Sequence, residues 1–409
     1  MSAKEMKYKY SDLSHNLTKC ITKKEKRDYG IFFTPPQTIK KNLKFLQPFM
    51  KNFKKILEPS CGSCEYIIQL NDLFQGEDVD ITGIEFNTHI YNSIDHFSSV
   101  RTKIYNADFL LFDDAKKYDL IIGNPPYFVM KKKDIHKRFH RFFNGRPNIF
   151  IIFILKSLEL LENGGILSFI LPTSFLNCLF YDETRKYISQ NYTILNIYYN
   201  DDSFIETKQD TVCVILQNLF PTNNSMHVLD VSNYTIFGEK NNISKLKELY
   251  INSSTLSQKG FSVNVGSVVW NQCKDILTND NSKTLLIYSS DIKNNIIKIQ
   301  KYKNKDKKNY ICKEGIREKI IVLNRGYGVG NYHLSYALID GDNQYLVENH
   351  LICIKINKKV DEDILFSLYG KIIKSFENDK TKQFIKLYFG NNAINTKELS
   401  EILPIYDDI

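Results

Sequence analysis

The stretch from Asp119 to Tyr127 constrains the fold more than any other part of the chain. An apolar run with strand character, Leu120–Ile122, ends at Gly123, and Asn-Pro-Pro-Tyr follows at once. In an open α/β sheet, ligands bind just outside the carboxyl ends of the strands. Prolines fix φ and donate no hydrogen bond, so this turn is stiff and its carbonyl groups face outward. The stretch therefore predicts a site that holds a planar, amine-bearing group between two hydrogen-bond acceptors and an aromatic ring.

The alternation of apolar runs and helical stretches before this turn predicts a parallel sheet. Lys55–Glu58 reads as a strand followed by a tight turn and a helix, Val79–Ile84 as a second strand and Lys103–Tyr105 as a third. This βαβαβ order is typical of an α/β sheet with right-handed crossovers. Further strands are expected at Ile166–Leu171, Ile194–Tyr199 and Val212–Leu216, with a buried helix at Ile149–Leu161 and another near Asp182–Gln190.

Composition and length bound the class of protein. A chain of 409 residues suggests two or three domains, and 43% hydrophobic with 25% charged residues describes a globular protein. We expect a basic extension over 1–28, a catalytic α/β domain over 29–240, a linker over 241–260 and a mixed α+β domain over 261–409. The longest apolar run, Ile149–Leu155, is far too short to span a membrane, so we expect an intracellular protein with reduced thiols.

Several polar residues lie where strands are predicted to end. Glu85 follows the second strand and can accept hydrogen bonds from two ribose hydroxyls, or it can be an exposed loop acid. Asp108 and Phe109 follow the third strand and suit either an adenine ring or a helix cap beside a core aromatic. Thr34 is a good N-cap with Pro35 as the first helical residue, or it lies over a ligand.

The order of these motifs resembles the gamma class of DNA adenine-N6 methyltransferases from restriction–modification systems. The resemblance runs from about Gly30 to the C-terminus and is better up to about Asn218 than beyond. It rests on a set of motifs in one order, namely Phe33-Thr34-Pro35, Glu58-Pro59 with Gly62, Glu85, Asp108-Phe109, Asn124-Pro125-Pro126-Tyr127 and Phe204. It implies a Rossmann-like catalytic domain that depends on S-adenosylmethionine and a C-terminal domain that recognises DNA.

The resemblance also implies roles for individual residues. Those expected to bind the cofactor are Thr34 at its methionine end, Glu58, Pro59 and Gly62 around its pocket, Glu85 at the ribose, Asp108 and Phe109 at the adenine, and Asn124 beside the methyl group. Those expected to act on the flipped target adenine are Asn124 and Pro125, whose oxygens accept both amino hydrogens, Pro126, which stiffens the turn, and Tyr127 and Phe204, which sandwich the ring. Core packing is the alternative for Phe204. No metal is expected.

The expected partner is double-stranded DNA, bound by a monomer, with a separate cognate restriction endonuclease as a possible companion. Two lysine-rich stretches, 131–146 and 293–308, suit phosphate binding or a solvated surface. Cys64 stands where the family usually has glycine, and its sulfur is expected near the cofactor. Cys61 and Cys64 also have the spacing of a redox or zinc pair, but no second close pair of Cys or His accompanies them.

Two other functions stay open at this point. The first is methyl transfer to RNA or to a protein glutamine, since both present a planar nitrogen to the same turn. The second is a catalytically silent DNA-binding homologue, which Cys64 makes conceivable.

Overall fold

The computed structural model describes residues 10–113, 115–201, 204, 209–326, 332–389 and 393–407. The chain divides into two units, Met1–Ile243 and Ser244–Ile409, and each is described by itself. Within the described residues, no helix is both long enough and apolar enough to cross a membrane.

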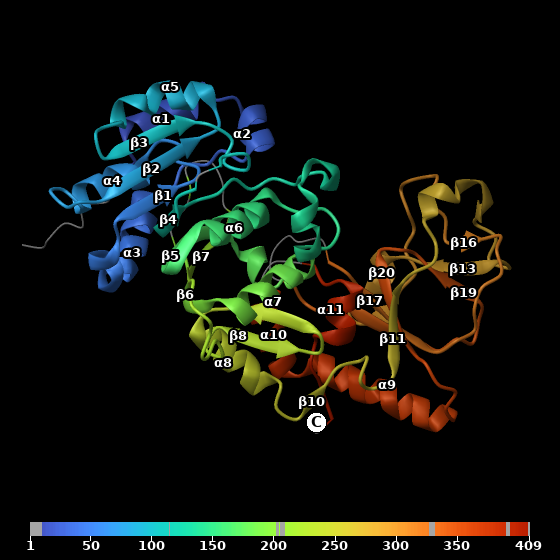
Figure 1. Cartoon of the computed structure of the whole chain (residues 1–409). Coiled ribbons are helices and arrows are strands. Elements are labelled where there is room, and N and C mark those ends of the chain that lie inside the picture. Colours follow the sequence, from blue (N-terminus) through green and yellow to red (C-terminus); the bar gives the residue numbers. More distant parts are fainter. Residues whose placement is uncertain are drawn as a thin grey trace, which may run out of the picture. The chain divides into compact units, whose positions relative to one another are not determined.

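A seven-stranded sheet forms the centre of the first unit, in the order β3-β2-β1-β4-β5-β7-β6 (Figure 1). Strand β7 runs antiparallel to its neighbours β5 and β6, and the other neighbouring strands are parallel. The seven strands are β1 (Lys55–Glu58), β2 (Asp80–Glu85), β3 (Thr102–Asn106), β4 (Tyr118–Gly123), β5 (Leu161–Pro172), β6 (Thr193–Tyr199) and β7 (Thr211–Gln217). The predicted Rossmann-like, mostly parallel α/β sheet is therefore confirmed.

Helices cover both faces of this sheet because its central strands are apolar on both sides. Ile56 of β1 belongs to one hydrophobic cluster and the next residue, Leu57, to the other, as period-two alternation requires. One face is covered by α1 (Asp12–Cys20), α3 (Pro36–Leu46), α4 (Glu65–Leu73) and α5 (Thr88–Ile94), and the opposite face by α6 (Ile149–Leu160) and α7 (Asp182–Asn191). The unit also contains α2 (Lys23–Tyr29), a hairpin of β8 (Val228–Val231) and β9 (Tyr234–Phe237), and the first residues of α8 (Lys240–Leu249).

The start of α3 differs from the prediction. Thr34 was expected to cap this helix with Pro35 as its first residue, but the helix begins at Pro36 and Pro35 occupies the N-cap position. Pro35 has φ −58° and ψ 132°, and no side chain caps the helix. The residue before a proline is driven away from helical ψ. Because Pro35 itself precedes Pro36, the helix cannot start one residue earlier.

In its described residues, the second unit contains two four-stranded sheets, two two-stranded pairs, most of helix α8 and three further α-helices. One sheet has the order β11-β20-β17-β18 and the other β12-β16-β13-β19. Residues 253 and 254, within the stretch expected to be a linker, form β10 and pair with β21 near the C-terminus. The larger strands and the helices are β11 (Phe261–Val265), β13 (Thr284–Ile287), β17 (Ile320–Asn324), β18 (Tyr336–Ile339), β19 (Tyr345–Val347), β20 (Leu351–Ile356), α9 (Glu362–Glu377), α10 (Asp379–Tyr388) and α11 (Thr396–Glu401). The shorter strands are β10 (Ser253–Ser254), β12 (Leu277–Thr278), β14 (Ile292–Lys293), β15 (Ile296–Ile297), β16 (Tyr310–Ile311) and β21 (Ile405–Tyr406).

Candidate active site

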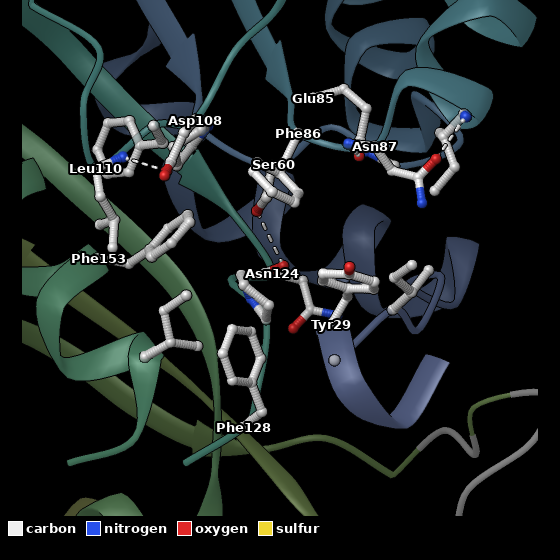
Figure 2. A pocket seen from close by; sticks show the side chains of 18 of the residues that line it. Tyr29, Ser60, Glu85, Phe86, Asn87, Asp108, Leu110, Asn124, Phe128 and Phe153 are labelled. Carbon is white, nitrogen blue, oxygen red and sulfur yellow. Dashed lines mark hydrogen bonds between the residues drawn. The ribbon is translucent and has the colours of Figure 1, made fainter. Parts of the chain in front are cut away.

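A cavity of about 230 Å³ lies at the carboxyl ends of the central parallel strands. The loops that follow β1, β2, β3 and β4 all contribute to its wall, as the carboxyl edge of a parallel sheet requires. Figure 2 shows side chains of the lining residues. The predicted site residues on its wall are Pro59, Gly62, Glu85, Asp108, Phe109, Asn124 and Pro126.

The loop after β1 brings its backbone close to the end of β2. Gly62 has φ +51°, and its N–H donates to Glu85 Oε2 over 2.9 Å. Cys64 also has a left-handed conformation, with φ 61°, at the start of α4. That conformation favours glycine over residues with a Cβ atom. The Cys64 side chain is fully buried in a hydrophobic cluster and lines neither this cavity nor the smaller one described below.

Glu85 is a buried carboxylate held by backbone donors. Its Oε1 accepts from the N–H of Asn87 over 2.8 Å, and its Oε2 accepts from Gly62. Burial raises the pKa of Glu85 to about 7, and hydrogen bonds from the backbone of Asn87, Gly62 and Phe86 oppose that rise. The carboxylate is therefore fixed at the cavity wall and changes charge near neutral pH.

A short turn after β3 forms the apolar end of the cavity. Asp108 Oδ1 accepts from the N–H of Leu110 over 2.9 Å, and Phe109 packs on Phe153 of α6 with ring centroids 4.9 Å apart. Lys156, also from α6, is buried and donates to the carbonyl groups of Leu110 and Phe112. Its Nζ lies 5.2 Å from the centroid of the Phe109 ring. One buried lysine thus fastens this turn to α6.

The Asn124 amide lies at the tip of β4 with its orientation fixed by two contacts. Its Nδ2 donates to the carbonyl oxygen of Phe32 over 3.3 Å, and its Oδ1 lies 2.6 Å from the hydroxyl of Tyr127. That hydroxyl also lies 2.8 Å from the carbonyl oxygen of Ile170. The Ser60 hydroxyl donates to the backbone carbonyl of Asn124, as the dashed line in Figure 2 shows.

The aromatic residues predicted to hold the target ring do not line the cavity. Tyr127 is half-buried and meets Phe150 edge to face, with ring centroids 6.0 Å apart. Phe204 is 6% exposed and belongs to the hydrophobic cluster under α3. Pro125 is buried, whereas Pro126 and the next aromatic residue, Phe128, do line the cavity.

A second, smaller cavity of about 30 Å³ adjoins the first, and Asn124 lines both. Its wall also includes Thr34, Glu58 and Glu65. Glu58 is 3% exposed, and its Oε2 has no hydrogen-bond partner among the described residues. Burial, with Cys64, Glu85 and Glu65 nearby, raises the pKa of Glu58 well above its usual value. An unpartnered buried carboxylate oxygen is costly, so this position suits a cationic ligand group.

Helix α1 contacts the segment that follows β1, next to the smaller cavity. Glu65 Oε1 accepts hydrogen bonds from the backbone and hydroxyl of Ser11 and from the hydroxyl of Ser14. The hydroxyl oxygen of Ser63 lies 2.7 Å from that of Ser14, which can accept its proton. These contacts fix α1 to the loop after β1.

Sequence reasoning missed several aromatic residues that line the main cavity, among them Tyr29, Phe86, Phe128 and Phe153. Phe86 is 57% exposed and faces Tyr29 with ring centroids 5.9 Å apart. A large aromatic residue directly after a strand-terminal acid was the available signal for Phe86. Phe153 lies inside a continuous apolar helix, where no pattern separates a wall residue from the core.

Within the described part of the chain, no group of three or more His, Cys, Asp or Glu residues could hold a metal ion. Cys61 and Cys64 are both free thiols, and burial is the main reason that the pKa of Cys61 is raised. A buried thiol with a raised pKa is a poor metal ligand and a poor nucleophile.

Comparisons with known proteins agree with this architecture. The family model described as Eco57I restriction-modification methylase matches residues 69–205. Modification methylase CviBIII of Paramecium bursaria Chlorella virus NC1A is 28% identical, and the alignment covers 97% of this chain and 99% of that protein. Type II methyltransferase M.CvrRI of Paramecium bursaria Chlorella virus XZ-6E is 26% identical over 97% of this chain and 99% of its own length.

A solved structure also shares the fold. The cryoEM structure of a DrdV–DNA complex aligns with a TM-score of 0.53 at 13% identity, covering 91% of this chain and 54% of that chain. The mostly parallel central sheet, in which β7 runs antiparallel to its neighbours, fits a Rossmann-like α/β fold.

Proposed function

We propose that this chain, which belongs to the type II restriction–modification methylase family and is thereby a DNA methyltransferase, acts on the N6 amine of adenine. In this proposal S-adenosylmethionine is the methyl donor, and the adenine is flipped out of double-stranded DNA. The observation that carries the proposal is the position of Asn124, whose oriented amide lines both the main cavity and the smaller one. An amine held at that amide would lie next to a donor group in the adjoining space.

The residues around the two cavities suit this donor along its length. Asp108, Phe109 and Phe153 offer an acceptor and ring surfaces for adenine, and Glu85 offers a carboxylate for the ribose hydroxyls. The unpartnered Glu58 Oε2 in the smaller cavity suits the ammonium group of the methionine end. When bound, S-adenosylmethionine supplies an electrophilic methyl group on a sulfonium centre.

Asn124 would activate the amine by orientation rather than by taking its proton. The lone pair of an exocyclic adenine amine is delocalised into the ring, so the amine is a weak nucleophile. Two acceptors, the Asn124 oxygen and the Pro125 carbonyl, would draw both amino hydrogens and favour a pyramidal nitrogen. Acceptors fixed before the reaction also stabilise the positive charge that develops on nitrogen. The proton becomes acidic after methylation and can leave then, so no strong base is needed.

The target base must leave the duplex to reach this cavity, at a cost of a few kcal/mol. Stacking on an aromatic ring contributes about 1–3 kcal/mol per base and offsets much of that cost. Tyr127 and Phe204 were the stacking residues expected from the sequence, and neither side chain lines the cavity. Phe128 does line the cavity, and we propose that it stacks on the flipped base.

The decisive experiment replaces the amide. Asn124→Ala should reduce methyl transfer to unmodified genomic DNA to background, because one acceptor and the orientation of the amine are lost. Affinity for S-adenosylmethionine should change less than about threefold, since the carboxylate at Glu85 is untouched. The measurements are transfer of labelled methyl groups and calorimetric titration with the cofactor.

Asn52→Ala is the control, because Asn52 is exposed in a short 3-10 helix, Gln47–Asn52, away from both cavities. Wild-type transfer by Asn124→Ala would refute the assignment. If the unaltered enzyme transferred methyl groups to RNA or protein and none to duplex DNA, the proposal that DNA is the substrate would be wrong. Mapping the methylated base in treated DNA tests adenine N6 directly.

A further inference from the structure

A positively charged segment follows the cavity wall in the first unit. Residues 131–146, here called the basic segment, begin directly after Phe128 and Met130 and end before Ile149, three residues that line the cavity. The base of the segment is closed by two hydrogen bonds, from Met130 N to Pro147 O and from Ile149 N to Phe128 O, each 2.9 Å long. The segment is therefore anchored at the active-site wall at both ends.

Apolar side chains fix the segment to the core while its cations stay outside. Ile135, Phe139, Phe142 and Phe143 are all buried in the hydrophobic cluster beneath α6. The segment contains two short 3-10 helices, Lys132–Asp134 and Lys137–Phe142. Along the segment, buried apolar side chains and exposed basic side chains alternate. His140 Nε2 lies 3.1 Å and 3.0 Å from the carbonyl oxygens of Lys132 and Ile135 and ties the two helices together.

The charges of the segment are largely unbalanced. Its basic residues are Lys131, Lys132, Lys133, Lys137, Arg138, Arg141 and Arg146, and all of them are exposed. Its one acid is Asp134. Among the described residues, Arg138 is the member of this set that forms an ion pair, with Glu159 of α6 at 3.0 Å. A surface that is not a binding site usually intersperses charges of both signs.

Two of the three arginines of the segment stack on its own aromatic rings. The guanidinium groups of Arg138 and Arg141 lie 4.6 Å from the ring centroids of Phe139 and Phe142. Stacking on a ring orients the plane of the guanidinium, and among the described residues Arg141 forms no ion pair that would occupy its N–H edge. Less side-chain entropy is then lost when an anion binds.

We propose that the basic segment grips the phosphates of the DNA strand that carries the target base. This inference rests on the proposed function, because it names the surface of the catalytic unit that holds that substrate. A base extruded into the cavity leaves its flanking phosphates at the rim, where the basic segment begins. Contacts at the rim hold the distorted backbone while the base is inside.

The lysine-rich stretch 293–308 is less free to do this. Lys307 Nζ lies 4.1 Å from the ring centroids of both Tyr288 and Tyr302. Lys308 donates to the carbonyl oxygen of Leu277, and Lys293 to the side chain of Gln300. These lysines hold the second unit together, whereas Lys131, Lys133 and Lys137 have no such partner among the described residues.

The test neutralises three of these lysines together. Lys131→Gln/Lys133→Gln/Lys137→Gln is compared with Lys51→Gln/Lys54→Gln/Lys55→Gln, which removes the same charge at the opposite end of β1 from Glu58. Binding of the full chain to a fluorescent 30-base-pair duplex of random sequence is titrated at several salt concentrations. Each phosphate that the protein no longer neutralises lowers the slope of log K against log salt by about 0.9, so we expect a drop of about 2 to 3 for the first variant.

The control triple should keep the wild-type slope within about 0.5, and both variants should keep the wild-type melting temperature because all six lysines are exposed. Equal slopes for the wild type and the first variant would overturn the inference, as would an equal drop in both triples. The proposed function fails separately, if the unaltered enzyme transfers no methyl group to unmodified DNA while its binding slope behaves as expected.

Discussion

At the scale of single residues, Glu85 carries the clearest electrostatic signature in the site. Its carboxylate is buried at the end of β2, and that burial raises its pKa to about 7. Because folding raises this pKa, Glu85 stabilises the fold most below about pH 4.5, and this contribution is lost as pH rises to about 7. A bound polyol that donates to the carboxylate would favour the ionised form.

Cofactor affinity should therefore depend on pH. If the ribose requires the ionised carboxylate, S-adenosylmethionine should bind about tenfold more weakly at pH 6 than at pH 8. Titration calorimetry between pH 5.5 and 8.5 measures this. Glu85→Gln should bind weakly throughout, with the pH dependence removed. A wild-type affinity that is flat across this range would contradict the proposed role of Glu85.

At the scale of elements, helix α2 supports the turn after β4. The helix ends at Tyr29, and Gly30 follows at its C-cap with φ +64°. A Cβ atom on Gly30 would lie 2.5 Å from Tyr127 N and 3.1 Å from Pro126 Cβ. The absence of a side chain at Gly30 thus allows the N-terminal helices to contact the turn that presents Asn124.

Gly30→Ala should disturb catalysis as well as stability. A displacement of about 1 Å at the reacting groups can reduce the rate about a hundredfold, so we expect a drop in kcat of at least tenfold. Gly76→Ala is a matched control, because Gly76 has φ +83° and no atom lies within 4 Å of an added Cβ. Both variants carry the left-handed strain of about 1–2 kcal/mol. Steady-state assays measure kcat. Equal kcat values in the two variants would contradict the proposal that α2 supports the turn that presents Asn124.

The elements were predictable where local pattern and tertiary packing agree. The strand before Asn124, the strand that ends at Glu85 and the buried helix at Ile149 follow from apolar runs and strong breakers. The start of α3 was predicted one residue too early, because either of two consecutive prolines can be the first residue of a helix. The side chain of Cys64 points into the core because the loop after β1 adopts a left-handed turn there, which spacing alone does not reveal.

The walls of the site were harder to predict than its polar groups. An acidic residue at the end of a predicted strand can be recognised in a sequence as a candidate site residue. Charged residues are seldom fully buried unless they are paired, so such a position calls for an explanation. In the sequence, Phe153 and Phe128 cannot be distinguished from aromatic residues of the hydrophobic core. Only the structure shows that they line the cavity. The hydrogen bond from the Ser14 hydroxyl to Glu65 joins positions 51 residues apart, and no local pattern encodes such a contact.

At the scale of the whole molecule, two units share one chain. The proposed cofactor site lies entirely in the first of them, since all residues that line both cavities precede Ser244. A ligand that binds one folded unit stabilises that unit by mass action. Thermal unfolding with and without cofactor can therefore distinguish the transition of the first unit from that of the second.

We expect two calorimetric transitions, of which S-adenosylmethionine shifts one. At a concentration one hundred times its dissociation constant, the cofactor stabilises its unit by about 2.7 kcal/mol. For a unit of this size, that raises the transition by about 5–10 °C. Differential scanning calorimetry with and without cofactor tests this. Two transitions that shift by the same amount would show that the cofactor also couples to the second unit.

The hydrogen bond from Asn124 Nδ2 to the Phe32 carbonyl explains why an amide suits the tip of β4 better than an acid. A carboxylate at that place would set one of its oxygens against the carbonyl oxygen of Phe32, and the two would repel each other. The polarity of the amide is thus dictated by a peptide group from a distant part of the chain. Which way the nitrogen and the oxygen of Asn124 point is settled by folding, before any substrate arrives.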